Sequence, residues 1–213
     1  MYHPEKKFIF IHPPKCAGTS LRLVLREAFN SCNKNINFEP FYMDLTDEGI
    51  DYIMPIHGSI SKFIKFICDR HGLGFFKREE WYIFSVVRNP YDRLVSYYHH
   101  SQVNNPNFVN GKTFKQFIET IISINEKSQN WSFYDLFHHK TKLFLDDYVR
   151  LENFEEDVKR ITNKLGIEDY KIHHYKPKSN RINYDYRSYY NDKMIDFVSK
   201  KLKWDIEYFN YKF

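Results

Sequence analysis

The sequence of 213 residues predicts an α/β fold, with a mostly parallel sheet flanked by helices, in a single domain that spans residues 1–213. Two short apolar runs, at residues 8–12 (FIFIH) and 81–87 (WYIFSVV), are typical of buried strands. Each run is followed by a loop and then by apolar residues at helical spacing, so the chain repeats the order strand, loop, helix. No internal repeat or low-complexity linker marks a domain boundary, which favours one domain.

In the first half of the chain, a helix is expected to begin near Thr19, after a Pro-Pro break that ends the first strand. Its apolar face consists of Leu21, Val24, Leu25 and Ala28. Residues 30–56 are expected to be irregular apart from a strand over 52–56, and residues 61–67 are expected to be helical. A helix follows the second strand, and its inward face consists of Tyr91, Leu94, Val95 and Tyr98.

The second half of the chain continues the alternation of elements. Residues 104–111 are polar and predict a loop, after which Thr113 and Gln116 make a capping box that predicts the start of a helix. Residues 147–152 predict a strand, and residues 153–166 predict a helix that ends at its glycine. The final helix carries the apolar residues Met194, Ile195, Val198 and Leu202.

The composition limits the possible partners only weakly. The formal net charge of +5, from 32 basic and 27 acidic residues, fits an anionic ligand. The same charge excess is equally well explained by a general bias of the composition toward Lys, Asn, Ile, Phe and Tyr, without any anionic ligand. No stretch approaches about 18 consecutive apolar residues, and residues 1–7 lack the apolar segment of a signal peptide. We therefore expect a cytoplasmic protein without a transmembrane segment, and peripheral contact with a membrane is left open.

The cysteines and histidines do not form a metal-binding pattern. The three cysteines are widely spaced, at Cys16, Cys32 and Cys68, which predicts no disulfide framework and indicates a reducing compartment. The ten histidines show no zinc spacing, and the adjacent pairs at 99–100, 138–139 and 173–174 would point apart on a helix or strand. We therefore expect no bound metal.

The strongest local signal is the segment HPPKCAGTS at residues 12–20, between the first strand and the first helix. In this context the N-terminus of the helix can bind an anion. Gly18 allows the backbone to approach a phosphate closely, and Lys15 adds a positive charge. The segment is not a Walker A loop, because its lysine precedes the glycine by three residues instead of following it. The alternative is a capped helix after a turn, with Lys15 on the surface.

A second motif, RNPYDRLVSYY at residues 88–98, follows the second strand. Arg88 lies where ligands bind in open α/β sheets, at the carboxyl end of a strand. Asn89 is suited to cap the next helix, and Pro90 to occupy its first turn. Ser96 lies about two turns into that helix, so its hydroxyl and the guanidinium could together bind a phosphate. An N-capped helix with an incidental arginine and serine is the alternative.

Together, the two motifs resemble the PAPS-dependent sulfotransferases, whose donor is 3′-phosphoadenosine 5′-phosphosulfate (PAPS). The sequence is most similar to the carbohydrate group, which includes heparan sulfate 2-O-sulfotransferase, and to its bacterial relatives. The 5′-phosphosulfate loop of the family matches Pro14, Lys15, Cys16, Ala17, Gly18, Thr19 and Ser20. Its 3′-phosphate motif matches residues 88–93 and Ser96. The resemblance implies a P-loop-like fold in which Lys15 contacts PAPS and both Arg88 and Ser96 hold the 3′-phosphate.

Weaker stretches of the resemblance bear on catalysis. Residues 56–58 resemble the segment that carries the catalytic histidine of the family, which makes His57 the expected general base. His12 and Glu152 are competitors for that role. The 2-O-sulfotransferases have a second histidine where this chain has Ser59. Residues 150–157 and 205–211 resemble later parts of the family sequence.

A basic, tyrosine-rich loop is expected at residues 176–190, and Arg181 within it is expected to border the nucleotide. The implied function is transfer of a sulfuryl group from PAPS to an acceptor hydroxyl, on an oligo- or polysaccharide, by in-line displacement without a metal. The product is 3′,5′-adenosine bisphosphate (PAP), and nucleic acid is not an expected partner. We expect no N-terminal membrane anchor of the kind that Golgi members have, and this expectation favours a bacterial or viral cytosolic enzyme. The alternatives are a P-loop-type nucleotide kinase and a noncatalytic protein that binds polyanions through the basic loop.

Overall fold

The computed structural model describes residues 1–30, 58–128, 131–172 and 185–213. They belong to two compact units. The first unit comprises Met1–Val87 and Leu136–Tyr175, and the second comprises Arg88–Asp135 and Lys176–Phe213.

Among its described residues, the first unit is built on a four-stranded sheet with the strand order β1-β2-β3-β6. Its strands are β1 (Tyr2–His3), β2 (Phe8–Ile11), β3 (Tyr82–Val87) and β6 (Asp147–Arg150). Strands β2, β3 and β6 are parallel to one another, and β1 pairs with β2 in the antiparallel direction. Each residue of β2 is buried, as the apolar run predicts. The prediction of a mostly parallel sheet in an α/β fold is therefore confirmed.

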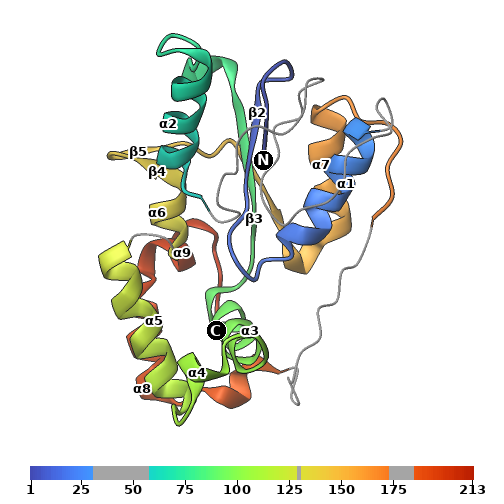
Figure 1. Ribbon diagram of the computed structural model, residues 1–213. Coiled ribbons are helices and arrows are strands. Elements are labelled where there is room, and N and C mark those ends of the chain that lie inside the picture. The colour runs from blue at the N-terminus through green and yellow to red at the C-terminus, as the bar shows by residue number, and fades with distance from the viewer. Residues whose placement is uncertain (31–57, 129–130, 173–184) are drawn as a thin grey trace. The chain divides into compact units, whose positions relative to one another are not determined.

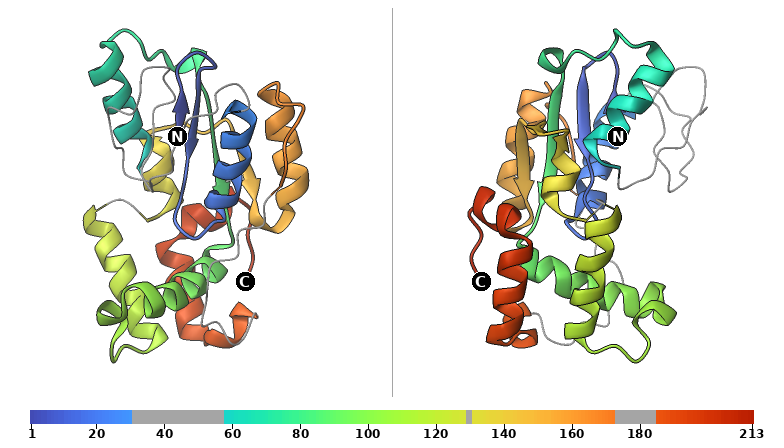
Figure 2. Two further views of the ribbon diagram at one scale, coloured as in Figure 1. Left: turned by 45° about the vertical axis from the view of Figure 1, so that its right-hand side comes forward. Right: turned by 90° about the vertical axis from the view of Figure 1, so that its left-hand side faces the viewer.

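Helices cover both faces of this sheet. Helices α1 (Gly18–Asn30) and α7 (Phe154–Lys164) lie on one face, and α2 (Ile60–His71) lies on the other (Figures 1 and 2). The described part of this unit also contains two short 3₁₀ helices, η1 (Arg78–Glu80) and η2 (Leu151–Asn153), and a small hairpin of strands β4 (His138–His139) and β5 (Lys142–Leu143). Helix α6 (Phe133–Phe137) lies where the chain passes from the second unit to the first.

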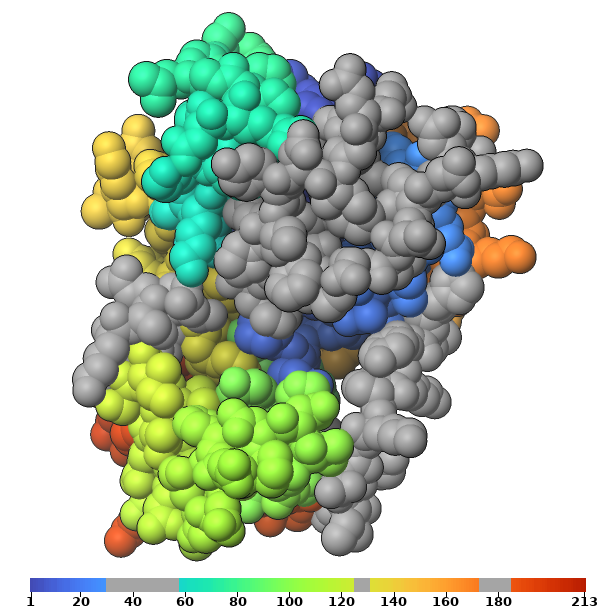
Figure 3. All heavy atoms as spheres, viewed as in Figure 1, coloured from blue at the N-terminus to red at the C-terminus, as the bar shows by residue number. Residues whose placement is uncertain are grey.

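The second unit is helical among its described residues. Its elements are α3 (Pro90–Asn104), α4 (Pro106–Val109), α5 (Phe114–Ser128), η3 (Tyr186–Tyr189), α8 (Asp192–Lys201) and α9 (Lys203–Tyr208). They enclose an apolar core that includes Leu94, Phe117, Ile118 and Val198. Figure 3 shows the side chains of α3, α4 and α5, in green to yellow-green, packed into one continuous surface.

Several local predictions are confirmed by backbone geometry. The Thr113 backbone N–H donates to Gln116 Oε1 at 2.9 Å, and the Gln116 N–H donates to Thr113 Oγ1 at 3.3 Å, which is the reciprocal pattern of a capping box. Gly166 follows α7 with a φ of 69°, the left-handed conformation that ends many helices.

Other local predictions are wrong in detail. Residues 104–111 are not only a loop, because Pro106 begins the short helix α4 and accepts a hydrogen bond from Asn110 N–H at 2.8 Å. The strand expected at 147–152 ends at Arg150, since the chain turns there into η2. The strand expected at 52–56 lies outside the described residues. Within the described ranges, no helix has both the length and the apolarity needed to cross a membrane.

Candidate active site

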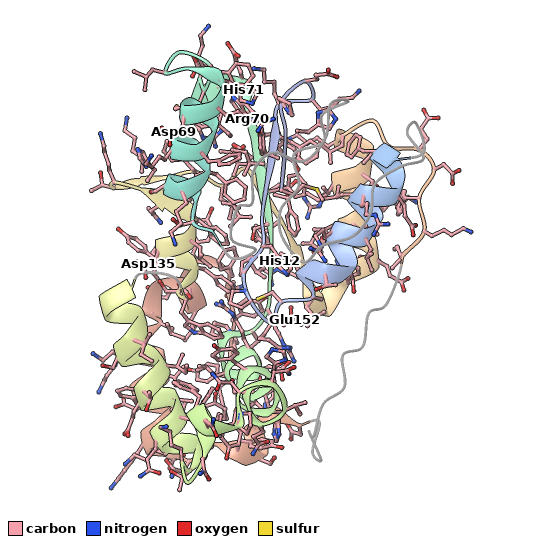
Figure 4. All side chains as sticks on the ribbon, in the orientation of Figure 1. His12, Asp69, Arg70, His71, Asp135 and Glu152 are labelled. Atoms are coloured by element: carbon pink, nitrogen blue, oxygen red, sulfur yellow. The ribbon has the colours of Figure 1, made fainter. Side chains whose placement is uncertain are left out.

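The candidate site begins at the carboxyl ends of the parallel strands. His12 directly follows β2, Arg88 directly follows β3, and Glu152 lies in η2 after β6. Val87 pairs with Arg150, so β3 and β6 end in register. Figure 4 shows His12 and Glu152 at this end of the sheet, whereas the labelled residues of α2 lie toward the opposite end. Ligands of open α/β sheets bind at the carboxyl edge.

The loop after β2 adopts a backbone that few residues favour. Pro13 and Pro14 have no N–H to continue the β ladder, so the strand ends before them. Lys15 and Ala17 then have left-handed φ angles of 65° and 63°, whereas the φ of Cys16 between them is not positive. Each left-handed non-glycine residue costs about 1 kcal/mol or more, and such strain is concentrated at functional sites. Alternation of this kind turns successive N–H groups toward one side, which is the geometry of an anion-binding nest.

The N-terminus of α1 continues this donor surface. The carbonyl of Ala17 accepts hydrogen bonds from the N–H groups of Ser20, at 3.0 Å, and Leu21, at 3.4 Å, so Ala17 occupies the capping position without a polar side chain. The first N–H groups of a helix have no acceptor within the helix, and they carry the positive end of its dipole. The first turn of α1 contains no acidic residue, in contrast to α3 and α7. This helix end therefore favours an external anion.

Gly18 is required by the close approach of a buried side chain. A Cβ atom on Gly18 would lie 1.9 Å from His12 Cδ2 and 2.2 Å from His12 Nε2. The His12 ring is 5% exposed and stacks on Phe10, with ring centroids 5.8 Å apart. His12 thus packs beneath the loop backbone and braces it, which is a poor position for a base that must meet an incoming acceptor.

The side chains of the loop differ in their access to a ligand. Cys16 is fully buried, and its Sγ donates to the Pro14 carbonyl at 3.6 Å. Ser20 is also buried, whereas Lys15 and Thr19 are half-buried. Lys15 and Thr19 can therefore present side-chain donors to an anion, while Cys16 contributes through its backbone.

The second motif orders an arginine at the start of α3. Arg88 Nε and one terminal nitrogen donate to Asp92 Oδ2, at 2.8 and 2.6 Å. Asn89 caps the helix by accepting a hydrogen bond from Tyr91 N–H at 3.0 Å, and its own amide donates to the Lys212 carbonyl at 2.8 Å. Ser96 lies four residues after Asp92, one turn further along the same helix face, and is half-buried. The expected phosphate ligands Arg88 and Ser96 therefore belong to one ordered segment of the second unit.

Not every basic residue of this motif is available to a ligand. Arg93 is only 1% exposed, and its guanidinium lies 3.9 Å from the Trp131 ring centroid and 4.5 Å from that of Phe133. Cation–π contacts of this kind stabilise a buried guanidinium. Arg93 thus has a packing role, which sequence reasoning did not anticipate.

Burial also raises the pKa of acidic groups in the second unit, Tyr190 and Asp205 among them. Burial raises the pKa of Tyr190, which donates its hydroxyl proton to the Tyr91 carbonyl at 2.9 Å, so this phenol stays neutral. Burial raises the pKa of Asp205 to about 6, although its carboxylate accepts hydrogen bonds from the N–H groups of Phe133 and Tyr134 at 2.8 and 3.1 Å. Asp205 caps α6, and sequence reasoning missed it because its partners are distant in the chain.

The remaining predicted site residues fall elsewhere. His57 and Arg181 lie outside the described residues. Ser59 is buried directly before α2, and Glu152 is exposed in η2. In the part of the chain that the structure describes, no group of three or more His, Cys, Asp or Glu side chains could hold a metal ion. The roles of Lys15, His57 and Arg181 stay predictions.

Asp92 is the residue of this site that sequence reasoning did not single out. The four-residue spacing of Arg88 and Asp92 could have indicated their ion pair, because residues at this spacing are neighbours on a helix. Arg88 precedes the helix, however, so the spacing alone does not predict the contact.

Comparison with known proteins supplies one family. A family model described as Sulfotransferase family matches residues 1–212, so one match runs through both compact units. A search of curated proteins found no match. Among solved structures, the chain is similar to the crystal structure of mouse sulfotransferase SULT7A1 complexed with PAP. The identity is 19%, the match covers 97% of this chain and 86% of that chain, and the TM-score is 0.49. The prediction of a single domain is not tested by these matches.

Proposed function

The chain belongs to the sulfotransferase family and is a PAPS-dependent sulfotransferase, and we propose that it sulfates a hydroxyl group of a carbohydrate. In this proposal the loop at residues 14–20 binds the 5′-phosphosulfate of the donor. Arg88 and Ser96 bind its 3′-phosphate, and Arg181 borders the nucleotide. The product nucleotide is PAP.

One observation carries the assignment of the donor site. The two segments that we propose as anion-binding follow adjacent parallel strands, and they are the loop after β2 and the start of α3 after β3. PAPS is a nucleotide with anionic groups at both its 5′ and its 3′ positions, so two separate binding segments suit it. A nucleoside di- or triphosphate carries its phosphates at the 5′ end alone, and it gives no reason for the second segment.

The loop also supplies what the reaction needs. In the proposed in-line displacement, the acceptor oxygen forms a bond to sulfur while the bond between sulfur and the 5′-phosphate oxygen breaks. Negative charge then builds on the leaving phosphate. The N–H groups of the loop, the dipole of α1 and the ammonium group of Lys15 offset this charge. The acceptor proton passes to a base, for which we propose His57.

The choice of a carbohydrate acceptor rests on two features of the sequence. The segment that contains His57 resembles that of the carbohydrate sulfotransferases. The chain also contains 17 Tyr and 20 Phe residues, and aromatic rings are suited to stack against sugars. We propose an oligo- or polysaccharide as the partner.

Binding of PAP and ADP tests the donor site. ADP carries two phosphate groups, as PAP does, but both are at the 5′ end. Calorimetry in EDTA should show that PAP binds much more tightly than ADP and without magnesium. Equal affinities would remove the argument for Arg88 and Ser96. Steep salt dependence with no nucleotide preference would instead support a polyanion-binding protein.

A further inference from the structure

We propose that Asp92 is a positioning residue that fixes the Arg88 guanidinium for the 3′-phosphate and thereby sets the preference for a 3′-phosphorylated nucleotide. This inference rests on the proposed function, because it assigns a task to Arg88 within it. Asp92 itself need not touch the nucleotide.

The geometry of the pair determines which part of Arg88 faces a ligand. One oxygen of Asp92 accepts from Nε at 2.8 Å and from a terminal nitrogen at 2.6 Å, so the carboxylate lies on the side edge of the guanidinium. A guanidinium binds a phosphate in bidentate fashion through two of its N–H groups, and the end edge with both terminal nitrogens can do so. The contact with Asp92 leaves that edge oriented away from the carboxylate.

The surroundings hold the pair in one arrangement. The Arg88 and Asp92 side chains are 12% and 20% exposed, much less than an ordinary surface pair. Asp92 lies in the first turn of α3, which is capped by Asn89. The Asn89 amide donates in turn to the Lys212 carbonyl at 2.8 Å and to the Tyr186 hydroxyl at 3.2 Å. An arginine that is ordered before binding loses less conformational entropy when the phosphate arrives.

Because Asp92 is negatively charged, the proposal predicts a definite direction for the change in PAP affinity when that charge is removed. A carboxylate close to a phosphate site repels the ligand, so removing its charge should tighten binding if simple electrostatics decided the outcome. If orientation of Arg88 decides it, the neutral variant should bind the 3′-phosphate less tightly. The two explanations therefore predict opposite changes in the affinity for PAP.

The test compares nucleotides that differ in one group. PAP and AMP are identical except for the 3′-phosphate, so the ratio of their dissociation constants isolates the contribution of that group. Calorimetry in EDTA on the full chain gives both constants for the wild type, Asp92→Asn and Asp92→Glu. A charged hydrogen bond that loses its geometry should weaken PAP binding by about tenfold in Asp92→Asn. Binding of AMP should stay as in the wild type, and Asp92→Glu should restore part of the affinity for PAP.

Asp196→Asn is the matched control. Asp196 lies on α8 of the same unit and pairs with Lys200 at 2.7 Å over the same four-residue spacing, with side chains 60% and 73% exposed. The control changes the net charge by the same amount and should leave the affinities for both nucleotides unchanged.

The outcomes separate this inference from the proposed function. Loss of PAP affinity alone in Asp92→Asn, with Asp196→Asn normal, supports the inference. If Asp92→Asn binds PAP equally or more tightly while the wild type still prefers PAP over AMP, the positioning role is wrong and the donor assignment stands. Equal losses for PAP and AMP would show a general structural role and overturn the inference. A wild type that does not prefer PAP would overturn the 3′-phosphate assignment and the inference with it.

Discussion

Replacing Gly18 by alanine tests the geometry of the phosphate loop. The new Cβ would lie 1.9 Å from His12 Cδ2, which is about 1.5 Å closer than van der Waals contact allows. His12 is buried against Phe10, so its ring cannot move without disturbing the β2 strand or the loop. The φ of Gly18 is not in the left-handed region, so the collision alone opposes the substitution.

The magnitude follows from two opposing effects. Added volume in a packed site destabilises a fold by about 1–3 kcal/mol. Replacing glycine by alanine where the backbone permits it stabilises by about 0.4–1 kcal/mol, because the unfolded chain loses freedom. The collision is the larger effect, so Gly18→Ala should lower the free energy of unfolding by about 1–2 kcal/mol and Tm by about 2–4 °C per kcal/mol. Displacement of the loop should also weaken PAP binding by about tenfold or more.

A double-mutant cycle identifies the cause. Thermal and urea unfolding of wild type, Gly18→Ala, His12→Ala and the double variant should show that Gly18→Ala becomes neutral or stabilising once the ring is removed. Gly74→Ala is the matched control, since a Cβ there meets nothing within 4 Å. If Gly18→Ala melts like the wild type, or if its cost is unchanged in the His12→Ala background, the reasoning about this contact is wrong.

Three further predictions concern single side chains. Lys15→Ala should lower kcat by about 100-fold or more and weaken PAP binding far less, and near-normal turnover with a raised KM for PAPS would assign Lys15 to binding alone. His57→Ala should lower the transfer rate by at least about 100-fold and leave the PAP affinity and Tm unchanged, and the wild-type rate should fall at acid pH. If the variant keeps more than about a tenth of the wild-type rate, another residue is the general base. Because burial raises the pKa of Asp205 to about 6, its protonated form stabilises the fold below about pH 4, and this contribution is lost as the pH rises through 6. In urea unfolding, the stability of the wild type relative to Asp205→Asn should therefore fall by roughly 2 kcal/mol from pH 4 to pH 7, and a constant difference would contradict the shift.

The sequence predicted the sheet well, because each central strand is apolar along its whole length. Residues 8–12 and 81–87 contain β2 and β3, and both are followed by the helices that their patterns predict. Strand β1 was missed, since two residues are too few to show a period. Helix α4 was missed because the polar composition around it also suits a loop.

The site was predictable where function depends on local sequence and not where it depends on tertiary contacts. The loop motif and Arg88 were found from their positions after strands. From the sequence, Gly18 was expected to let the backbone approach a phosphate closely. The structure gives a more specific reason for this glycine, because a Cβ atom there would collide with the His12 ring. Arg93 was included in the stretch that matches the 3′-phosphate motif, yet its guanidinium packs on Trp131 and Phe133, which lie in a segment distant in the sequence that no local pattern indicates.

The central claim is most directly tested by transfer of labelled sulfur. The full chain is incubated in EDTA with sulfur-labelled PAPS and a panel of glycans, tyrosine peptides and small alcohols. Lys65→Ala, at an exposed pair on α2, serves as an active control beside Lys15→Ala. We expect labelled glycan and released PAP with the wild type and the control, and little transfer with Lys15→Ala. Label that stays on PAPS with each acceptor, or that moves equally well with Lys15→Ala, would contradict the claim.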